Sequence, residues 1–233
     1  MRELLISLAI KYQGNIFKIR KALKNNEQIA LNELPKAITI VDSDYPLELL
    51  NLKYPPYVLF YEGNKELLKT RKISIVGSRK MCEYGKYVTI QIVNQLNDKY
   101  TMVSGLAKGI DSIVHQNAKD TIAVVGNGLD IRYPKENEWL YEQLFTSQLV
   151  LSEYPKGVAP TKENFPFRNR IIAALGESLV VTQAAKRSGT MLTVNSALEL
   201  GKEVYTVPYR LYDIEGAGCN ILLQQGANMI VSR

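Results

Sequence analysis

Residues 73–105 read ISIVGSRKMCEYGKYVTIQIVNQLNDKYTMVSG, and this stretch decides the fold class. Its two ends, 73–77 and 101–105, are short apolar runs that contain β-branched residues and finish in glycine. Between them, residues 83–96 repeat apolar side chains at the spacing of a helix. A strand, a helix and a second strand in this order predict a βαβ unit whose strands lie parallel in a buried sheet.

The same alternation continues towards the C-terminus. Residues 109–118 and 190–201 have helical spacing. The final stretch, CNILLQQGANMIVSR at 219–233, has the pattern of a helix that Gly226 stops, followed by a last strand. Further short apolar runs occupy 121–126, 148–154, 178–184 and 203–208. We therefore expect an α/β fold with a mainly parallel sheet flanked by helices. Ligands of open α/β sheets bind at the carboxyl edge of the strands, so the loops at that edge are the candidate site.

The first 72 residues have a different pattern. Residues 4–13 and 16–25 have the spacing of two short helices, whereas 37–46 and 57–64 have the composition of strands. This pattern predicts a short helical N-terminal region over 1–36, which caps a main domain over 37–233.

Composition places the chain among globular proteins of a reducing compartment. Hydrophobic residues make up 46% and charged residues 22% of the chain, as in an ordinary folded domain. Two cysteines are too few for a disulfide framework or a metal cluster. The opening MRELLISLAI is short and interrupted by Glu3, and no run approaches the ~20 apolar residues of a membrane span. We expect a cytoplasmic location, without a membrane partner.

Net charge does not identify a partner by itself. The total is +6, but residues 1–72 hold 12 Lys and Arg against 8 Asp and Glu, a net +4. Residues 73–233 hold 17 against 15, a net +2. The larger part of the chain is nearly balanced, so only the placement of particular cations can indicate an acidic ligand.

Four loops that follow predicted strands carry small, hydroxyl or cationic residues. Turn amides, a hydroxyl and a cation together suit phosphate, although an ordinary strand-to-helix turn also explains each loop alone. The 125–137 loop has a G-x-G, but Ile131 replaces the third glycine of a dinucleotide fingerprint, and no P-loop is present. The four sets are Gly77, Ser78 and Arg79; Ser104, Gly105 and Lys108; Asn127, Tyr133 and Lys135; and Ser188, Gly189 and Thr190.

A fifth segment, ENFPFRNRIIAAL at 163–175, places Arg168 and Arg170 near the start of an apolar helix. Cations at a helix N-terminus oppose its partial positive charge, unless an anion lies against them. Solvated surface arginines are the other interpretation. Residues two apart lie about 200° from each other on a helix, so both side chains cannot point the same way.

These segments together resemble the DNA-processing protein A family, also called DprA or Smf. The resemblance runs from about residue 38 to the C-terminus through YPPYVLFYEGN, ISIVGSRKMCEYG, VSGLAKGID, TIAVVGNGLDIRYPKEN, SEYP, FPFRNRIIAAL, RSGTMLT and EVYTVP. It implies an extended Rossmann-like fold that binds single-stranded DNA. It also implies a homodimer that protects incoming DNA during natural transformation in competent cells and helps to load the RecA recombinase.

The resemblance also assigns residues to a DNA-binding pocket. Arg79 of the GSR turn and Lys135 of the YPKEN segment match its basic positions. The FPxRNR segment adds Phe165, Arg168, Asn169 and Arg170, of which we expect one arginine to bind DNA and the other to serve the structure. We expect about three phosphates to be neutralised, a salt slope near −2 at ~−0.7 per phosphate, and bases stacked on Tyr133 or Phe165.

The chain departs from the family pattern at Gln183 and Tyr209, where glutamate and glycine are frequent. It stops at Arg233, so we expect no C-terminal winged helix. We expect a dimer interface over 220–231, where packing within one chain is an equally good explanation.

The rival interpretation is a nucleotide-binding Rossmann-like enzyme of the phosphoribohydrolase, or lysine decarboxylase-like, class. Alignment on Gly189-Thr190 puts Thr193 where that class needs a catalytic glutamate. His115 lacks a nucleophile motif nearby, and Cys82 lacks a second histidine to activate it. We therefore predict no catalytic residue, no metal and no cofactor.

Overall fold

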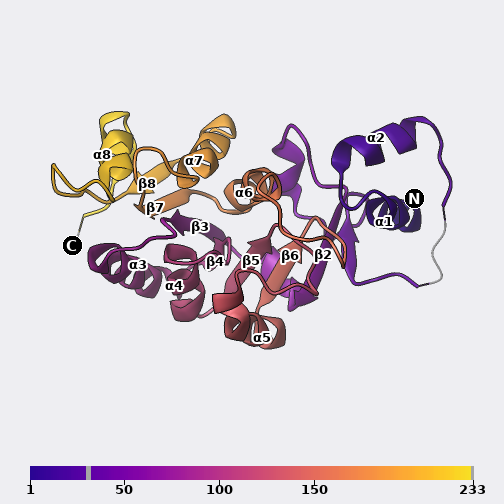
Figure 1. Ribbon diagram of the computed structural model, residues 1–233, viewed down its shortest axis with the longest axis horizontal. Helices are drawn as coiled ribbons and strands as arrows, with labels where there is room; N and C mark the ends of the chain where they lie inside the picture. Colours follow the sequence, from indigo (N-terminus) through magenta and orange to yellow (C-terminus); the bar gives the residue numbers. More distant parts are fainter. Residues whose placement is uncertain (30–32, 232–233) are drawn as a thin grey trace.

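The computed structural model describes residues 1–29 and 33–231 (Figure 1). One sheet of nine strands runs through it in the order β1-β2-β6-β5-β4-β3-β7-β8-β9. The strands are β1 (Ala37–Thr39), β2 (Val58–Gly63), β3 (Lys72–Gly77), β4 (Thr101–Ser104), β5 (Thr121–Val125), β6 (Leu149–Ser152), β7 (Leu179–Gln183), β8 (Val204–Thr206) and β9 (Asn228–Met229).

Helices flank this sheet. The α-helices are α1 (Arg2–Lys11), α2 (Ile16–Lys24), α3 (Glu83–Leu96), α4 (Ile110–Asn117), α5 (Glu138–Ser147), α6 (Asn164–Leu175), α7 (Thr190–Glu199) and α8 (Ala217–Gln224). The 3₁₀ helices found in the described residues are η1 (Leu47–Asn51), η2 (Lys65–Lys69) and η3 (Lys135–Asn137). None of the helices in these described ranges is both long enough and apolar enough to cross a membrane.

The strands from β3 to β9 pair in parallel, whereas β2 pairs antiparallel with both β1 and β6. The chain runs outward from β3 through β4, β5 and β6, and it returns through α6 to β7 on the other side of β3. The predicted α/β fold of extended Rossmann-like type is confirmed. This reversal places a switch point between β3 and β7, where a crevice opens at the carboxyl ends of the strands.

The predicted βαβ unit is present, and α3 spans the predicted residues 83–96. The predicted strand over 37–46 ends at Thr39, because the Asp42 carboxylate accepts the Thr39 N–H at 2.9 Å and starts a turn. The sequence did not single out α5, which exposes Trp139 and buries Leu140 and Tyr141 next to it.

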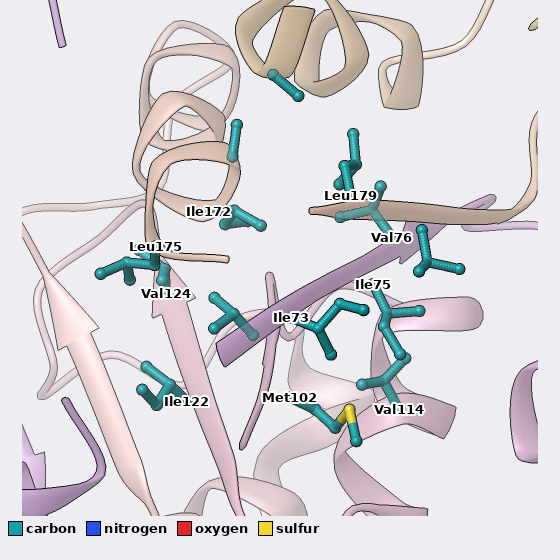
Figure 2. Close-up of a cluster of buried hydrophobic side chains, with 14 of the residues drawn as sticks. Ile73, Ile75, Val76, Met102, Val114, Ile122, Val124, Ile172, Leu175 and Leu179 are labelled. Atoms are coloured by element: carbon teal, nitrogen blue, oxygen red, sulfur yellow. The ribbon is translucent and has the colours of Figure 1, made fainter. Parts of the chain in front are cut away.

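The main core lies between the sheet and the helices on both of its faces. Ile75 of β3, Met102 of β4 and Ile122 of β5 belong to it, together with Ile172 and Leu175 of α6 (Figure 2). These side chains are almost completely buried, which fixes α6 against the centre of the sheet. The start of α6 is therefore held beside the switch point.

A second cluster joins the predicted region 1–36 to the sheet. Leu5 and Leu8 of α1 pack with Phe60 of β2, Val125 of β5 and Leu140 of α5. Burial of a leucine side chain contributes about 1.5–3 kcal/mol, so this contact anchors α1 firmly. The N-terminal helices thus share a hydrophobic core with β2, β5 and α5.

Candidate functional site

A groove of about 620 Å³ lies at the switch point. Residues 77–80, at the end of β3 and in the turn after it, form one wall, and residues 188–190 at the start of α7 form another. The first turns of α6 contribute Phe165, Arg168 and Asn169, and the segment before α8 contributes Ile214. Ala107 and Asp111 after β4 and Tyr133 after β5 also line the groove, so all five segments that the sequence singled out contribute to it.

A second hollow of about 260 Å³ adjoins this groove. Both are lined by Arg79, Ala107, Tyr133, Phe165 and Arg168. The second hollow extends past Lys108 towards Asn127, so it adds these two predicted residues, neither of which lines the groove. Together the two hollows form a continuous depression along the carboxyl edge of β3, β4 and β5.

Aromatic rings and a guanidinium form the wall that both hollows share. The Tyr133 and Phe165 rings stack with their centroids 5.4 Å apart and an angle of 24° between their planes. The Arg79 guanidinium carbon lies 5.3 Å from the centroid of the Phe165 ring. Tyr133 is 42% exposed and Arg79 is also exposed. This wall offers both a flat π surface and a positive charge to an incoming ligand.

The turn after β3 is fixed so that its cations face outward. The Ser78 hydroxyl accepts the Lys80 N–H at 3.1 Å and donates to the Lys80 carbonyl at 2.9 Å. A Cβ at Gly77 would lie 2.6 Å from the Ile110 side chain, so this close approach of the turn to α4 requires glycine. Ser78 thus organises the turn, while Arg79 and Lys80 extend into solvent.

The start of α7 is tied to the end of β3. The Thr190 hydroxyl donates to the Gly77 carbonyl at 3.1 Å. Open space surrounds Gly189, and the buried Ser188 hydroxyl has no hydrogen-bond partner within residues 1–29 and 33–231. A helix start with free space beside it suits an anion, because its N–H groups carry partial positive charge.

Arg168 lies beneath the groove and supports the loops from below. It is 4% exposed, and its guanidinium donates to the Gly105 carbonyl at 2.7 Å, to the Val124 carbonyl and to the Asn169 amide oxygen. Burial lowers the pKa of Arg168 to about 10. A Cβ at Gly105 would lie 2.6 Å from the Asp111 carboxylate and 2.8 Å from Arg168, so glycine is needed where these two charges meet.

Arg170 points to the opposite side of α6. Its guanidinium donates to Glu153 Oε1 at 2.8 Å, to the Tyr54 carbonyl at 3.2 Å and to the Phe167 carbonyl at 3.1 Å. Both members of the Arg170–Glu153 pair are buried, and burial raises the pKa of Glu153 in spite of the guanidinium beside it. Arg170 does not line either hollow.

A family model described as DNA recombination-mediator protein A matches residues 36–233. This chain belongs to the DNA recombination-mediator protein A family. Known members of the family include the DNA processing protein DprA of Streptococcus pneumoniae, which is 42% identical over 200 residues, covering 84% of this chain and 71% of that protein. DprA of Bacillus subtilis is 38% identical over 239 residues, covering 99% of this chain and 79% of that protein.

Solved structures of this family have the same fold. The crystal structure of S. pneumoniae DprA superimposes with a TM-score of 0.85 and 34% identity, covering 98% of this chain and 93% of that one. DprA of Helicobacter pylori, whose structure is described as showing a unique single-stranded DNA binding mode, gives a TM-score of 0.79 and 33% identity. That match covers 85% of this chain and 92% of the H. pylori chain.

The other predicted site residues of this family member differ in exposure. Ser104 is buried and donates to the Ile75 carbonyl at 2.7 Å, and the buried Asn127 amide donates to the Gly128 and Ile131 carbonyls. Lys108 is exposed but forms an ion pair with Glu136. Lys135 is exposed two residues after Tyr133, lines neither hollow and forms no ion pair with the rest of the described chain.

Sequence reasoning missed several residues of the groove, among them Lys80, Lys162 and Ile214. Lys80 directly follows Arg79, and Lys162 precedes the FPFRNR segment, so their positions beside the motifs could have identified both. Ile214 comes from a loop that follows β8, and its approach to the groove depends on packing of distant segments. No local signal in the sequence marks it.

His115 and Cys82 have structural roles. The buried His115 Nδ1 lies 2.7 Å from the Thr121 hydroxyl, and burial lowers the pKa of His115 to about 3. Cys82 caps α3, because its sulfur accepts the Gly85 N–H at 3.4 Å. Within the described ranges, no group of three or more His, Cys, Asp or Glu side chains is arranged to hold a metal ion.

Proposed function

We propose that this protein binds single-stranded DNA along the carboxyl edge of its sheet. The observation that carries the proposal is the wall shared by the two hollows, where the exposed Arg79 guanidinium lies over Phe165 and Phe165 stacks on Tyr133. Unpaired bases present π faces that such rings can stack on, whereas the bases of a duplex are already stacked. Family membership and the DNA-binding description of the H. pylori relative support the same ligand.

Capture begins with charge. Arg79, Lys80 and Lys135 are exposed and form no ion pair elsewhere in residues 1–29 and 33–231, so their charges are available to phosphates. Neutralising about three phosphates releases counterions and gives a slope of log K against log[salt] near −2, at ~0.7 per phosphate. Contact through backbone and π faces gives little preference for sequence.

The wider role follows from this binding. A strand held in the groove has its bases and backbone covered, which protects it from nucleases. We propose that the protein protects incoming DNA during natural transformation and hands it to the RecA recombinase in the cytoplasm. A homodimer through residues 220–231 would place two grooves on one strand and raise the apparent affinity through effective concentration.

We also propose that the protein acts without catalysis. Thr193 is buried in the first turns of α7, at the place where the rival phosphoribohydrolase class needs a glutamate. A threonine hydroxyl cannot act as a general acid or base near neutral pH. The Asp111 carboxylate, which lines the groove, faces the Arg168 guanidinium that supports the loops.

A gel-shift series tests the proposal. The wild-type protein, Arg79→Glu and the control Lys119→Glu are titrated with single- and double-stranded oligonucleotides at several salt concentrations. Lys119 is exposed just before β5, at the opposite edge of the sheet. We expect preference for the single strand, a loss of about tenfold or more in Arg79→Glu, and wild-type affinity in Lys119→Glu. Equal affinity for both DNA forms, or equal losses in both variants, overturns the assignment.

A further inference from the structure

Three aromatic rings gather where α2 meets α6, away from the groove. The Phe17 ring of α2 lies 5.1 Å from the Tyr54 ring and 6.4 Å from the Phe167 ring of α6, measured between centroids. Phe17 is 55% exposed, although burying a phenylalanine would stabilise the fold by about 1.5–3 kcal/mol. We call Phe17, Tyr54 and Phe167 the aromatic platform.

The platform is held rigidly from below. The Arg170 guanidinium carbon lies 3.8 Å from the centroid of the Phe167 ring, and Glu153 fixes that guanidinium at 2.8 Å. The Asn15 side chain caps α2 by accepting the Lys18 N–H at 3.0 Å, which fixes the turn that carries Phe17. A preformed surface loses little conformational entropy when a ligand binds to it.

A hollow of about 410 Å³ opens beside the platform, lined by Phe17, Lys18 and Phe167. Residues 161–167 separate this hollow from the groove. Lys162 and Phe165 line the groove, whereas residues 161, 163, 164 and 167 line the hollow. α6 lies between α7 and the N-terminal helices (Figure 1). A flexible strand that leaves the groove over residues 161–167 therefore arrives at the platform.

We propose that the aromatic platform binds unpaired bases of the same DNA strand as it leaves the groove. This inference rests on the proposed function, since it extends the binding track from the sheet to the N-terminal helices. Lys53 lies 5.6 Å from the Tyr54 ring centroid, and Lys18 borders the hollow, so cations accompany the rings of the platform. Rings with adjacent cations match a polyanion whose bases have free π faces.

The length of the DNA oligonucleotide distinguishes binding at the platform from binding in the groove. Fluorescence anisotropy measures the affinity of the wild-type protein, Phe17→Ala and Phe17→Tyr for oligo(dT) of about 6 and about 16 nucleotides, lengths within the range of single-strand sites. We expect Phe17→Ala to bind the long strand about tenfold more weakly and the short strand as the wild type does, because loss of one stacked base costs about this factor. Phe17→Tyr keeps the ring and should keep the affinity.

Tyr87→Ala is the matched control, since Tyr87 is 61% exposed on α3, far from α2 (Figure 1). Wild-type affinity of Phe17→Ala for the long strand overturns the inference, as does an equal loss for both lengths or in Tyr87→Ala. A platform that binds a protein instead of DNA also gives wild-type affinity for the long strand. Failure of the wild-type protein to bind either strand refutes the proposed function instead, and thermal melting verifies that each variant is folded.

Discussion

Two sets of cations at the carboxyl edge of the sheet have the same formal charge but opposite environments. The exposed rim consists of Arg79, Lys80 and Lys135, which extend into solvent without ion pairs in the part of the chain described. The buried support consists of Arg168 and Arg170. Both guanidinium groups donate hydrogen bonds to backbone carbonyls, and that of Arg170 also donates to the Glu153 carboxylate. Residue type alone therefore does not distinguish a ligand-binding cation from one that holds the fold.

The difference separates affinity from stability. A solvated cation keeps its hydration, so it hardly affects the free energy of unfolding, and it can exchange its counterion for a phosphate. A buried guanidinium is costly to desolvate, and it is tolerated because its hydrogen bonds and its carboxylate partner offset that cost. We expect changes in the exposed rim to alter DNA binding, and changes in the buried support to alter the free energy of unfolding.

The largest effect is expected from Arg170→Met, which leaves Glu153 buried without its partner. The free energy of unfolding should fall by about 3–5 kcal/mol, as when one member of a buried ion pair is removed. Urea denaturation measures it. The double variant Arg170→Met with Glu153→Leu removes both charges and should recover part of the loss. If the free energy of unfolding changed by less than about 0.5 kcal/mol in Arg170→Met, Arg170 would not stabilise the fold and would resemble the cations of the exposed rim.

Acid should weaken the buried interior while the cations of the rim keep their charge. The Thr121 hydroxyl donates to the Met102 carbonyl, so His115 Nδ1 donates to Thr121 and the buried Nε2 stays unprotonated, with no partner in the described chain. Burial lowers the pKa of His115 to about 3 in the folded state, whereas the pKa is about 6.5 in the unfolded chain. The stability that depends on neutral His115 is therefore present above pH 6.5 and is lost as the pH falls towards 3.

Between pH 7 and pH 4 the free energy of unfolding should fall by about 3 kcal/mol through His115, at 1.36 kcal/mol per pKa unit. Urea denaturation at several pH values measures it, with His115→Asn as the comparison. Asp111 and Glu153, whose pKa values burial raises, titrate in both proteins and cancel in the difference. Identical pH profiles for the two proteins would exclude His115 as the titrating group.

Tyr133→Leu separates stacking from charge within the groove. The Tyr133 ring stacks on Phe165 and is partly exposed, so its loss should weaken single-strand binding about tenfold, within the ~1–3 kcal/mol of a stacked base. The slope of log K against log[salt] should stay unchanged, because no phosphate contact is removed. Anisotropy titrations over a salt series measure both quantities. A shallower slope in this variant would mean that Tyr133 positions a cation.

The smallest effect distinguishes two lysines of the same edge. Lys135→Ala should reduce the magnitude of the salt slope by ~0.7, since its free charge neutralises one phosphate. Lys108→Ala should change the slope less, because Glu136 already pairs with Lys108. Glu136→Gln releases Lys108 and should steepen the slope. Equal slopes for the two alanine variants would show that the ion pair does not hold in solution.

The sequence predicted the fold because its signals are local. Apolar runs of four to six residues, bounded by Gly, Ser or Pro, specify buried strands, and the spacing within 83–96 specifies α3. α5 was not singled out because Trp139, Leu140 and Tyr141 are three consecutive apolar residues, although Trp139 is exposed and the other two are buried. The sequence alone does not show which of the three belong to the buried face of the helix. The packing of α1 on the sheet depends on contacts between residues far apart in the chain.

The site could be predicted less completely, since burial depends on distant partners. Arg79 and Gly77 were recognisable because their turn is local. Nothing near Arg170 in the sequence indicates that its partners are Glu153, 17 residues away, and Tyr54, 116 residues away. Ser104 has the residue type of a phosphate ligand, yet its hydroxyl serves the carbonyl of the neighbouring strand. The contacts predicted for Ser104 and Arg170 with DNA stay predictions.

Photo-cross-linking tests the central claim most directly. A single strand that carries 5-iododeoxyuridine is irradiated in complex with the full chain, and mass spectrometry identifies the linked residues. We expect links to Tyr133 and Phe165 at the shared wall of the groove. Links confined to the amino edge of the sheet, around Lys119, would contradict the account.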